Sequence, residues 1–277
     1  MKKSIFTKTF ALEKREKYCK NCSQHLVLEQ KYCHNCGQRA DTHRINYHFL
    51  LHEIQHGIFH VDKGILFTIK ELFTRPGHSI REYIEGKRQS HFKPALLIMI
   101  LATVTVLLNH WINGGKYLMG DTVSVNGIDK TGEINDEQFV KIANSIGENF
   151  NIVLTWINEH FAISMLLMIP FFAFAFWLAF RKFRLNFPEW LVISCFITGQ
   201  GMLLYMVLIV LGKKFANLNS IFFLSLVGVI VWTMLQYFNK SRKTSIVLRT
   251  LWALFIYYAI FVGIILVFIF AIILQNR

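Results

Sequence analysis

Five long apolar stretches constrain this chain more than any other feature of its sequence. They cover residues 94–112, 161–180, 190–212, 220–238 and 250–274. Each has about the 20 mostly apolar residues that a helix needs to cross the hydrocarbon core of a bilayer, and none contains Asp, Glu, Lys or Arg. A soluble domain places its apolar residues at scattered core positions instead. The stretches therefore predict an all-α polytopic membrane protein with about five transmembrane helices.

The residues before Pro94 differ in composition from the rest of the chain. Residues 1–93 hold 17 of the 30 Lys and Arg, nine of the 11 His and four of the five Cys. We therefore expect three parts. These are a basic arm with a small zinc ribbon (1–44), juxtamembrane amphipathic helices (45–93) and a membrane domain (94–277) with an external loop (113–160).

The loops between the apolar stretches predict the orientation of the chain. Residues 181–184 and 240–243 are strongly basic, whereas residues 113–160 carry three Lys against seven acidic residues. Because basic loops stay in the cytoplasm, we expect the N-terminus inside and the C-terminus outside.

No apolar segment typical of a cleavable signal peptide precedes the charged residues 13–17. The first spanning helix is therefore expected to act as the insertion signal.

Four cysteines form the most specific motif of the chain. Two residues separate Cys19 from Cys22 and Cys33 from Cys36, and Gly37 follows the second pair. Two such pairs can present four thiolates in the tetrahedral arrangement that Zn²⁺ prefers. Because this short segment cannot bury a core, the metal is expected to supply its folding free energy. The spacing predicts one structural Zn²⁺ per chain, and a rubredoxin-type iron site or a redox dithiol pair is the alternative.

A row of histidines lies between the cysteines and the first apolar stretch. Residues 45–73 have the apolar periodicity of one helix. Within this segment four histidines are spaced four residues apart: His48, His52, His56 and His60. Histidines four residues apart on a helix can chelate a second metal or respond to pH. We favour the alternative, a polar helix edge at the level of the lipid headgroups, because no Cys or carboxylate completes a metal site.

A second juxtamembrane helix is predicted after the turn sequence TRPG at residues 74–77. Ser79 and Glu82 have the spacing of a capping box, so we expect this helix to begin at Ser79 and to continue to residue 93. Five cations near its ends predict contact with anionic lipid headgroups. They are Arg75, Arg81, Lys87, Arg88 and Lys93. Simple anchoring by positive charge on the cytoplasmic side is the alternative.

Two features of this second helix predict how it packs. Tyr83, Ile84 and Phe92 are expected to insert at the membrane interface. Gly86 would cost a helix about 1 kcal/mol relative to Ala. This cost predicts that another helix or a lipid headgroup approaches closely at Gly86.

The external loop contains two short patterns. Asn126 and Gly127 form the sequence of a tight hairpin turn between short alternating segments. Apolar residues from Phe139 to Ile157 recur every three or four positions, which predicts an amphipathic helix on the outer face of the membrane or packed over the bundle.

The motifs of residues 19–94 resemble those of a known family. The two Cys pairs are followed by DKG at residues 62–64, TRPG at 74–77 and IREYIEGKR at 80–88, and the pattern ends at Pro94. This arrangement resembles an uncharacterised family of bacterial multi-pass membrane proteins, common in Bacteroidota, that is defined by domain of unknown function 3667. The resemblance implies a location in the bacterial inner membrane and a zinc ribbon. It implies no activity, and after residue 94 it extends only to the hydropathy pattern.

The sequence favours a non-enzymatic function over transport. The zinc ribbon would dock a cytoplasmic protein partner while the helices anchor or sense, and the uncharged spans argue against an ion pathway. The absence of an arrangement typical of hydrolytic catalysis argues against an enzyme, and a metal or acid/base pair at His110 and His160 is the alternative. Because topology explains the basic residues, we expect no nucleic-acid partner. The alternative is a transporter or channel for a lipid or small apolar solute. Its support is Pro170 and the GQG sequence at residues 199–201, which would break two spans near the midplane.

Overall fold

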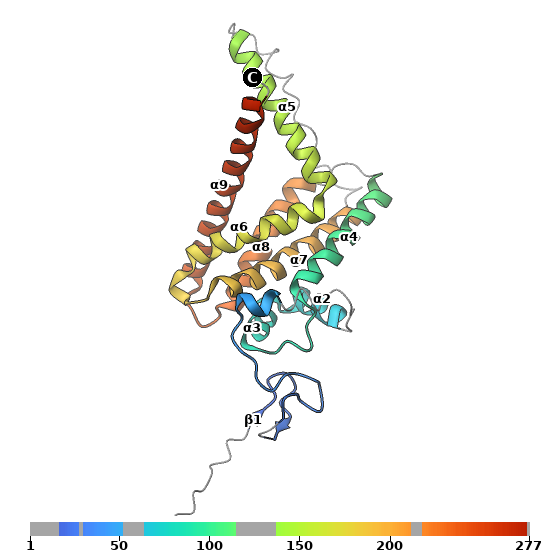
Figure 1. Ribbon diagram of the computed structural model, residues 1–277, viewed down its shortest axis with the longest axis vertical. Coiled ribbons are helices and arrows are strands. Elements are labelled where there is room, and N and C mark those ends of the chain that lie inside the picture. The colour runs from blue at the N-terminus through green and yellow to red at the C-terminus, as the bar shows by residue number, and fades with distance from the viewer. Residues whose placement is uncertain (1–16, 28–29, 52–63, 115–136, 212–217, 276–277) are drawn as a thin grey trace, which may run out of the picture.

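The structure is a computed structural model that describes residues 17–27, 30–51, 64–114, 137–211 and 218–275. Helices dominate, apart from a small antiparallel sheet of β1 (Lys17–Tyr18) and β2 (His25–Leu26). Figure 1 shows a helix bundle with the small sheet-containing head at one end. Helix α5 (Glu137–Glu159) and the C-terminal end of the chain lie at the opposite end.

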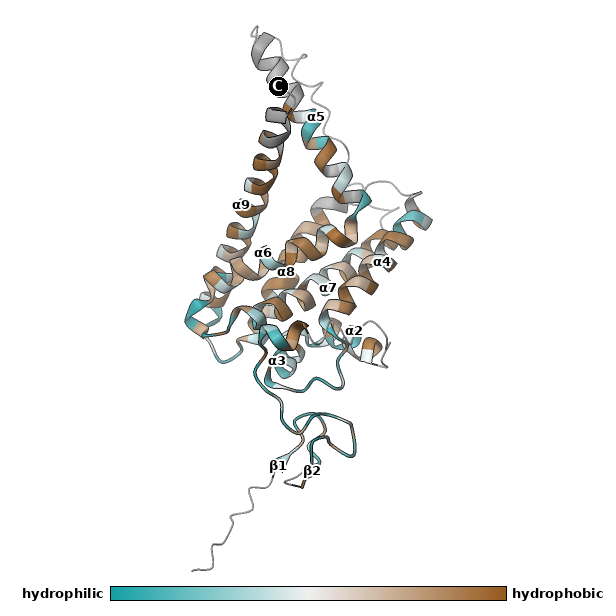
Figure 2. Ribbon diagram, viewed as in Figure 1, coloured by the Kyte–Doolittle hydropathy of each residue, from teal (hydrophilic) through white to brown (hydrophobic). Residues whose placement is uncertain are grey.

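Four helices of the described chain are long and apolar enough to cross a membrane. They are α4 (Pro94–Asn113), α6 (Phe161–Ala179), α7 (Phe187–Leu211) and α9 (Lys243–Gln275). Helix α8 (Leu218–Tyr237) has a shorter apolar segment, Ile221–Tyr237. In Figure 2 these helices are mostly hydrophobic and the head is mostly hydrophilic. The structure confirms a helical multi-pass membrane protein, and a fifth crossing by α8 stays a prediction.

Two sequence features that predicted helix breaks do not interrupt the helices. Helix α6 continues through Pro170, and α7 continues through Gly199, Gln200 and Gly201.

Helix α9 begins at Lys243, earlier than the predicted residue 250, and so includes Arg249. The Arg249 guanidinium donates to the carbonyl oxygen of Ala179 at the end of α6 (2.7 Å). Since terminal helix carbonyls lack partners within their own helix, this bond satisfies both groups.

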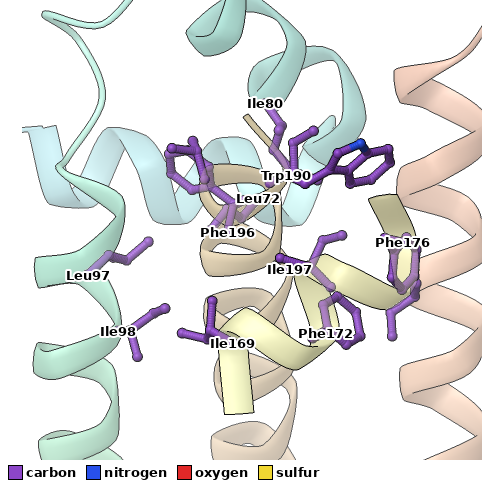
Figure 3. Close-up of a cluster of buried hydrophobic side chains, with 14 of the residues drawn as sticks. Leu72, Ile80, Leu97, Ile98, Ile169, Phe172, Phe176, Trp190, Phe196 and Ile197 are labelled. Carbon is purple, nitrogen blue, oxygen red and sulfur yellow. The ribbon is translucent and has the colours of Figure 1, made fainter. Parts of the chain in front are cut away.

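The centre of the bundle is helix α7, which packs against α4, α6 and α8. Figure 3 shows Phe196 and Ile197 of α7 in a buried cluster with Leu97 and Ile98 of α4. At the start of α7, the Trp190 ring lies 5.4 Å from that of Phe180 and 5.9 Å from that of Phe176, between ring centroids. Because a lipid solvent gives no hydrophobic drive between helices, such close packing holds them together.

Two short helices, α2 (Gly64–Thr74) and α3 (Pro76–Glu85), cap the head-side end of the bundle. Helix α3 starts at Pro76, whose fixed φ suits a first turn, so the predicted start and capping box at Ser79 are wrong. Ser79 lies inside the helix, and its Oγ is 2.8 Å from Nε2 of buried His91. The helix ends at Glu85, not at residue 93, because Gly86 adopts φ +115° and closes its C-terminus.

Helix α3 approaches α8 so closely that only glycine fits at residue 77. A Cβ there would collide with the carbonyl oxygen of Thr233 and the backbone nitrogen of Tyr237. The Gly77 N–H donates to Oε1 of Gln236 (3.1 Å), and Arg81 donates to the Gln236 carbonyl oxygen (2.7 Å). The glycine of the TRPG sequence therefore lies in the first turn of α3 and allows close packing against α8.

Gln200 has a structural role in the middle of α7. Its Nε2 donates to the carbonyl oxygen of Leu72 in α2 (2.9 Å), and its Oε1 accepts from Oγ1 of Thr233 in α8 (2.9 Å). Gln200 therefore joins three helices, and its amide is satisfied within the protein.

The loop of residues 86–93 folds back over α2 and α3 and completes the core. Tyr83 and Phe92 are almost fully buried, so their predicted insertion at the membrane interface is wrong. Ile84 is half-buried against the same core. The Phe92 N–H donates to Oγ1 of Thr68 (2.7 Å), which satisfies a buried backbone group.

Several predictions fall wholly or partly outside the described residues. His48 is exposed and lies in the helical residues 47–51. His52, His56 and His60 belong to residues 52–63, which separate this helix from α2 and lie outside the described residues. The row of histidines and the single helix over 45–73 therefore stay predictions. The hairpin turn at Asn126 also lies outside, but the amphipathic helix of the external loop is confirmed as α5.

Candidate metal centre and its junction with the membrane helices

Four cysteine thiols converge in the head. Ligand atoms of Cys19, Cys22, Cys33 and Cys36 all lie within 4.8 Å of one another. The Sγ atoms of Cys19 and Cys36 are 3.6 Å apart, and those of Cys22 and Cys33 are 3.5 Å apart. Metal–sulfur bonds of about 2.3 Å in a tetrahedron place the sulfurs about 3.8 Å apart, and none of these cysteines forms a disulfide. The four residues can therefore hold one metal ion, as their spacing predicts.

The two cysteine pairs belong to an internal repeat that the sequence analysis missed. Residues 18–25 are YCKNCSQH and residues 32–39 are YCHNCGQR, so the Tyr, both Cys, the Asn and the Gln recur 14 residues later. The β1–β2 pairing flanks the first unit, and an antiparallel bridge between Tyr32 and Arg39 flanks the second. The signal was visible in the sequence as shared Tyr, Asn and Gln around each pair.

Backbone hydrogen bonds repeat in the same way. In the first unit Cys19 N–H donates to the Gln24 carbonyl (2.8 Å), and in the second Cys33 N–H donates to the Gln38 carbonyl (2.8 Å). The residue after each pair has a positive φ, 61° at Ser23 and 73° at Gly37. Glycine adopts this left-handed conformation without strain at residue 37, and Ser23 adopts the same conformation without being glycine.

The charge state of the thiols favours a bound cation. A hydrogen bond from the Gln24 backbone lowers the pKa of Cys22, whereas burial raises the pKa of Cys36. Four sulfurs within 4.8 Å of one another cannot all ionise without a compensating positive charge. A divalent cation supplies that charge, and four thiolates fill a tetrahedral shell. With such an ion bound, four thiolates would leave no open position for a substrate.

Residues from both repeat units bind the loop that precedes α4. Oε1 of buried Gln38 accepts hydrogen bonds from the backbone N–H groups of Arg88 (3.2 Å) and Gln89 (2.9 Å). In the first unit, Oδ1 of Asn21 accepts from Oγ of Ser90 (2.9 Å). These bonds attach the head to a loop that enters the first membrane helix directly.

Gly86 lies where the head meets the end of α3. A Cβ at Gly86 would lie 2.7 Å from Oγ1 of Thr42 and 3.1 Å from Cδ of Lys20, and Lys20 Nζ donates to the Glu85 carbonyl (3.2 Å). The prediction of a close approach at Gly86 is correct, but the neighbour is the head. The glycine caps the helix with a positive φ and does not lie in the helix interior.

The head is also attached to the start of α7. Arg44 makes a bidentate ion pair with buried Glu189, with Nε–Oε1 at 2.6 Å and Nη2–Oε2 at 2.8 Å. Glu189 and Asn186 form a reciprocal capping box, with both backbone-to-side-chain distances at 2.8 Å. Asn186 Nδ2 also donates to the Ile45 carbonyl (2.9 Å). The sequence analysis missed this contact, although Asn and Glu three residues apart before an apolar run are a capping signal.

The five cations predicted to meet lipid headgroups divide into two sets. In the first set, Arg75 contacts Glu71 and Glu82 at 2.6 and 2.7 Å, and Lys87 contacts Glu82 at 2.8 Å. Burial alone would raise the pKa of Glu82, but hydrogen bonds from Arg75 and Lys87 outweigh it and lower the pKa. Arg81 also belongs to this set, because it bonds α8 and Asn239.

In the second set, Arg88 and Lys93 line a cavity beside the head. Their predicted contact with lipid stays a prediction.

Comparison with known families identifies the segment next to the head. Residues 62–106 match a family model described as Protein of unknown function (DUF3667). The match includes α2, α3, the loop of residues 86–93 and the first part of α4. Neither the comparison with curated proteins nor that with solved structures finds a match. The match to the DUF3667 family model therefore covers residues 62–106, the segment that joins the head to the membrane helices.

Proposed function

We propose that this protein is a non-enzymatic module of the bacterial inner membrane that couples a zinc-loaded cytoplasmic head to its membrane helices. The observation that carries the proposal is the double attachment of the head. One attachment reaches the loop before α4 through Gln38, and the other reaches the start of α7 through Arg44 and Glu189. A conformational change in the head would therefore alter the contacts at the ends of two helices, α4 and α7.

The surface of the head suits a protein partner. Tyr18 and Tyr32 occupy equivalent repeat positions and are 55% and 59% exposed, and Val27 is 61% exposed. Exposed aromatic and aliphatic side chains on a small basic domain are typical of a protein contact surface. Binding there would leave the attachments to α4 and α7 in place.

Basic residues support the cytoplasmic placement of the head. The segments before α7 and α9 contain Arg181, Lys182, Arg184, Lys240 and Arg242. By the positive-inside rule these segments and the head face the cytoplasm, where reduced thiols are available for zinc. The C-terminal end of α9 then lies outside.

Hydrogen exchange of the full chain, with and without its metal, tests the coupling. Removing the metal should speed exchange at the amides of Arg88 and Gln89 and in the first turn of α7. Gln38→Ala should speed exchange at the same two loop amides with the metal still bound. The matched control is Gln24→Ala, the equivalent and exposed position in the first repeat unit. Exchange that changes only in residues 17–45 would contradict the coupling.

One observation favours a second function, the carriage of a lipid or small apolar solute. A cavity of about 440 Å³ lies among α5, α6, α7, α8 and α9, and no charged residue contributes to its described lining. This volume falls in the roughly 300–1,000 Å³ range of ligand pockets. Ser164→Trp should fill the cavity and displace a copurifying lipid, as native mass spectrometry would detect. The control is Val207→Trp on the exposed side of α7.

A further inference from the structure

We propose that the cavity between the head and the loop before α4 binds a phosphate group. The cavity has a volume of about 190 Å³. At roughly 30 Å³ per water molecule in the liquid, it has room for a phosphate with attendant waters. Its walls come from the second repeat unit and the residues after it on one side, and from residues 88–93 on the other.

Three cations from these two walls surround the cavity. They are Arg39 of the head and Arg88 and Lys93 of the loop. Among the residues that the structure describes, no hydrogen bond or ion pair is formed by the side chains of Arg39 and Lys93. The one acidic residue of the lining, Asp41, is 2.9 Å from Nε2 of His43. The cavity therefore has an excess of positive charge, which favours an anion.

The side chain of Arg88 is already positioned by the protein. Its Nη2 donates to the His43 carbonyl (3.0 Å), its Nε is 3.3 Å from the Tyr83 carbonyl, and its guanidinium lies over the Phe49 ring at 4.4 Å. An arginine fixed in this way loses little further entropy when it binds an oxyanion. The planar guanidinium group of an arginine suits the geometry of phosphate oxygens.

Neutral polar residues complete the lining beside these cations. Thr42 and Gln89 are among them. A hydroxyl group and a side-chain amide can each donate a hydrogen bond to an oxyanion. The cavity therefore combines three cations with neutral donors.

The position of the cavity fits the phosphate of a membrane lipid. Lys93 immediately precedes Pro94, the first residue of α4, so it lies where the chain enters the apolar part of the bundle. A free phosphate offers the same chemistry as a lipid headgroup. The choice of a lipid as the source rests on the proposed cytoplasmic placement of this face, whereas the phosphate site itself does not.

Calorimetric titration of the metal-loaded full chain in a phosphate-free detergent tests the site. The two probes are inorganic phosphate and dihexanoyl phosphatidic acid below its micelle concentration. The variant Arg39→Gln/Lys93→Gln should lose about 100-fold in affinity for the probe that binds, or roughly tenfold per cation. The matched control Lys31→Gln/Lys70→Gln removes two exposed cations elsewhere and should bind as the wild type does.

The outcomes separate the sources and keep the inference falsifiable. Binding of both probes supports a phosphate site open to soluble phosphate, and binding of phosphatidic acid alone supports a lipid headgroup site. Equal affinities of the variant and the control, or no binding of either probe to the wild type, would overturn the inference. Arg39→Gln alone, at an exposed position, replaces the double variant if the latter loses its metal. None of these results depends on the exchange experiment that tests the coupling.

Discussion

The head and the membrane bundle are stabilised by different interactions. The buried apolar cluster of the head consists of Cys19, Leu26 and Cys33, two of which are metal-ligand candidates. The bundle instead buries a continuous cluster of Leu, Ile, Phe and Trp side chains that includes Trp190 and Phe196. Polar groups join the two parts through Gln38, Asn21 and Arg44. We therefore expect the head to depend on a metal held by its cysteines, whereas the bundle is held by packing and the junction by hydrogen bonds and an ion pair.

Loss of the metal should have the largest effect and should be confined to the head and its junction. Structural zinc sites contribute about 10–16 kcal/mol of apparent folding free energy in small domains. Cys22→Ser/Cys36→Ser should abolish a content of one zinc per chain, measured by elemental analysis of the full protein. Limited proteolysis should then cleave the head, while circular dichroism should show an intact helical bundle. Iron in the wild type would refute the assignment of zinc, and collapse of the bundle in the variant would refute this division.

Removal of Arg44 should have the next largest effect and should act at the junction. Glu189 is almost fully buried, and loss of one partner leaves a buried charge unpaired, at a cost of about 3 kcal/mol. Arg44→Ala should therefore lower the thermal unfolding temperature, whereas Arg44→Ala/Glu189→Gln should recover part of the loss. A double variant less stable than the sum of the two single variants would show that the pair is not the cause.

Closer packing at residue 77 tests the bundle alone. Gly77→Ala places a Cβ against the backbone of α8, and overpacking of this kind costs about 1–3 kcal/mol. The metal content should stay unchanged while the unfolding temperature falls. The control is Gly228→Ala, where an added Cβ meets nothing within 4 Å. An equal response of the two variants would argue against the close contact between α3 and α8.

Acid should have the smallest effect and should act through His91. Burial lowers the pKa of His91 from 6.5, with Glu71 and Glu82 opposing the shift and Lys87 adding to it. Because the unfolded chain takes up the proton first, stability should fall as the pH drops below about 6.5 and should level off below the folded pKa. His91→Gln should show a weaker fall of unfolding temperature between pH 7 and pH 5. An identical pH profile in this variant would assign the effect elsewhere.

Patterns carried by one segment predicted the fold and the metal ligands well. Helices α4, α6, α7 and α8 lie within three residues of the apolar stretches, because length and apolarity decide such a helix locally. The four cysteines meet as their spacing predicts. A chelating site formed by two neighbouring pairs needs no distant partner to be recognised.

Features that depend on distant contacts were predicted poorly. Ser79 has the spacing of a helix cap but lies beside His91. Gln200 belongs to a sequence that predicted a break in its span, but it lies within a continuous helix and bonds Leu72 and Thr233. Gly86 ends its helix against residues of the head far away in sequence. In each case a local rule describes one preference of the residue, and a tertiary neighbour decides which preference is realised.

The 14-residue repeat gives the head two sets of equivalent side chains, each drawn from both units, that differ in what they contact. Lys20, Asn21 and Gln38 bind the end of α3 and the loop after it. Their counterparts in the other unit are the exposed residues His34, Asn35 and Gln24. Only one of the two equivalent sets of side chains therefore contacts α3 and the loop after it. A similar set of side chains faces the solvent on the other side of the head. The attachment is therefore asymmetric, although the head itself is nearly symmetric.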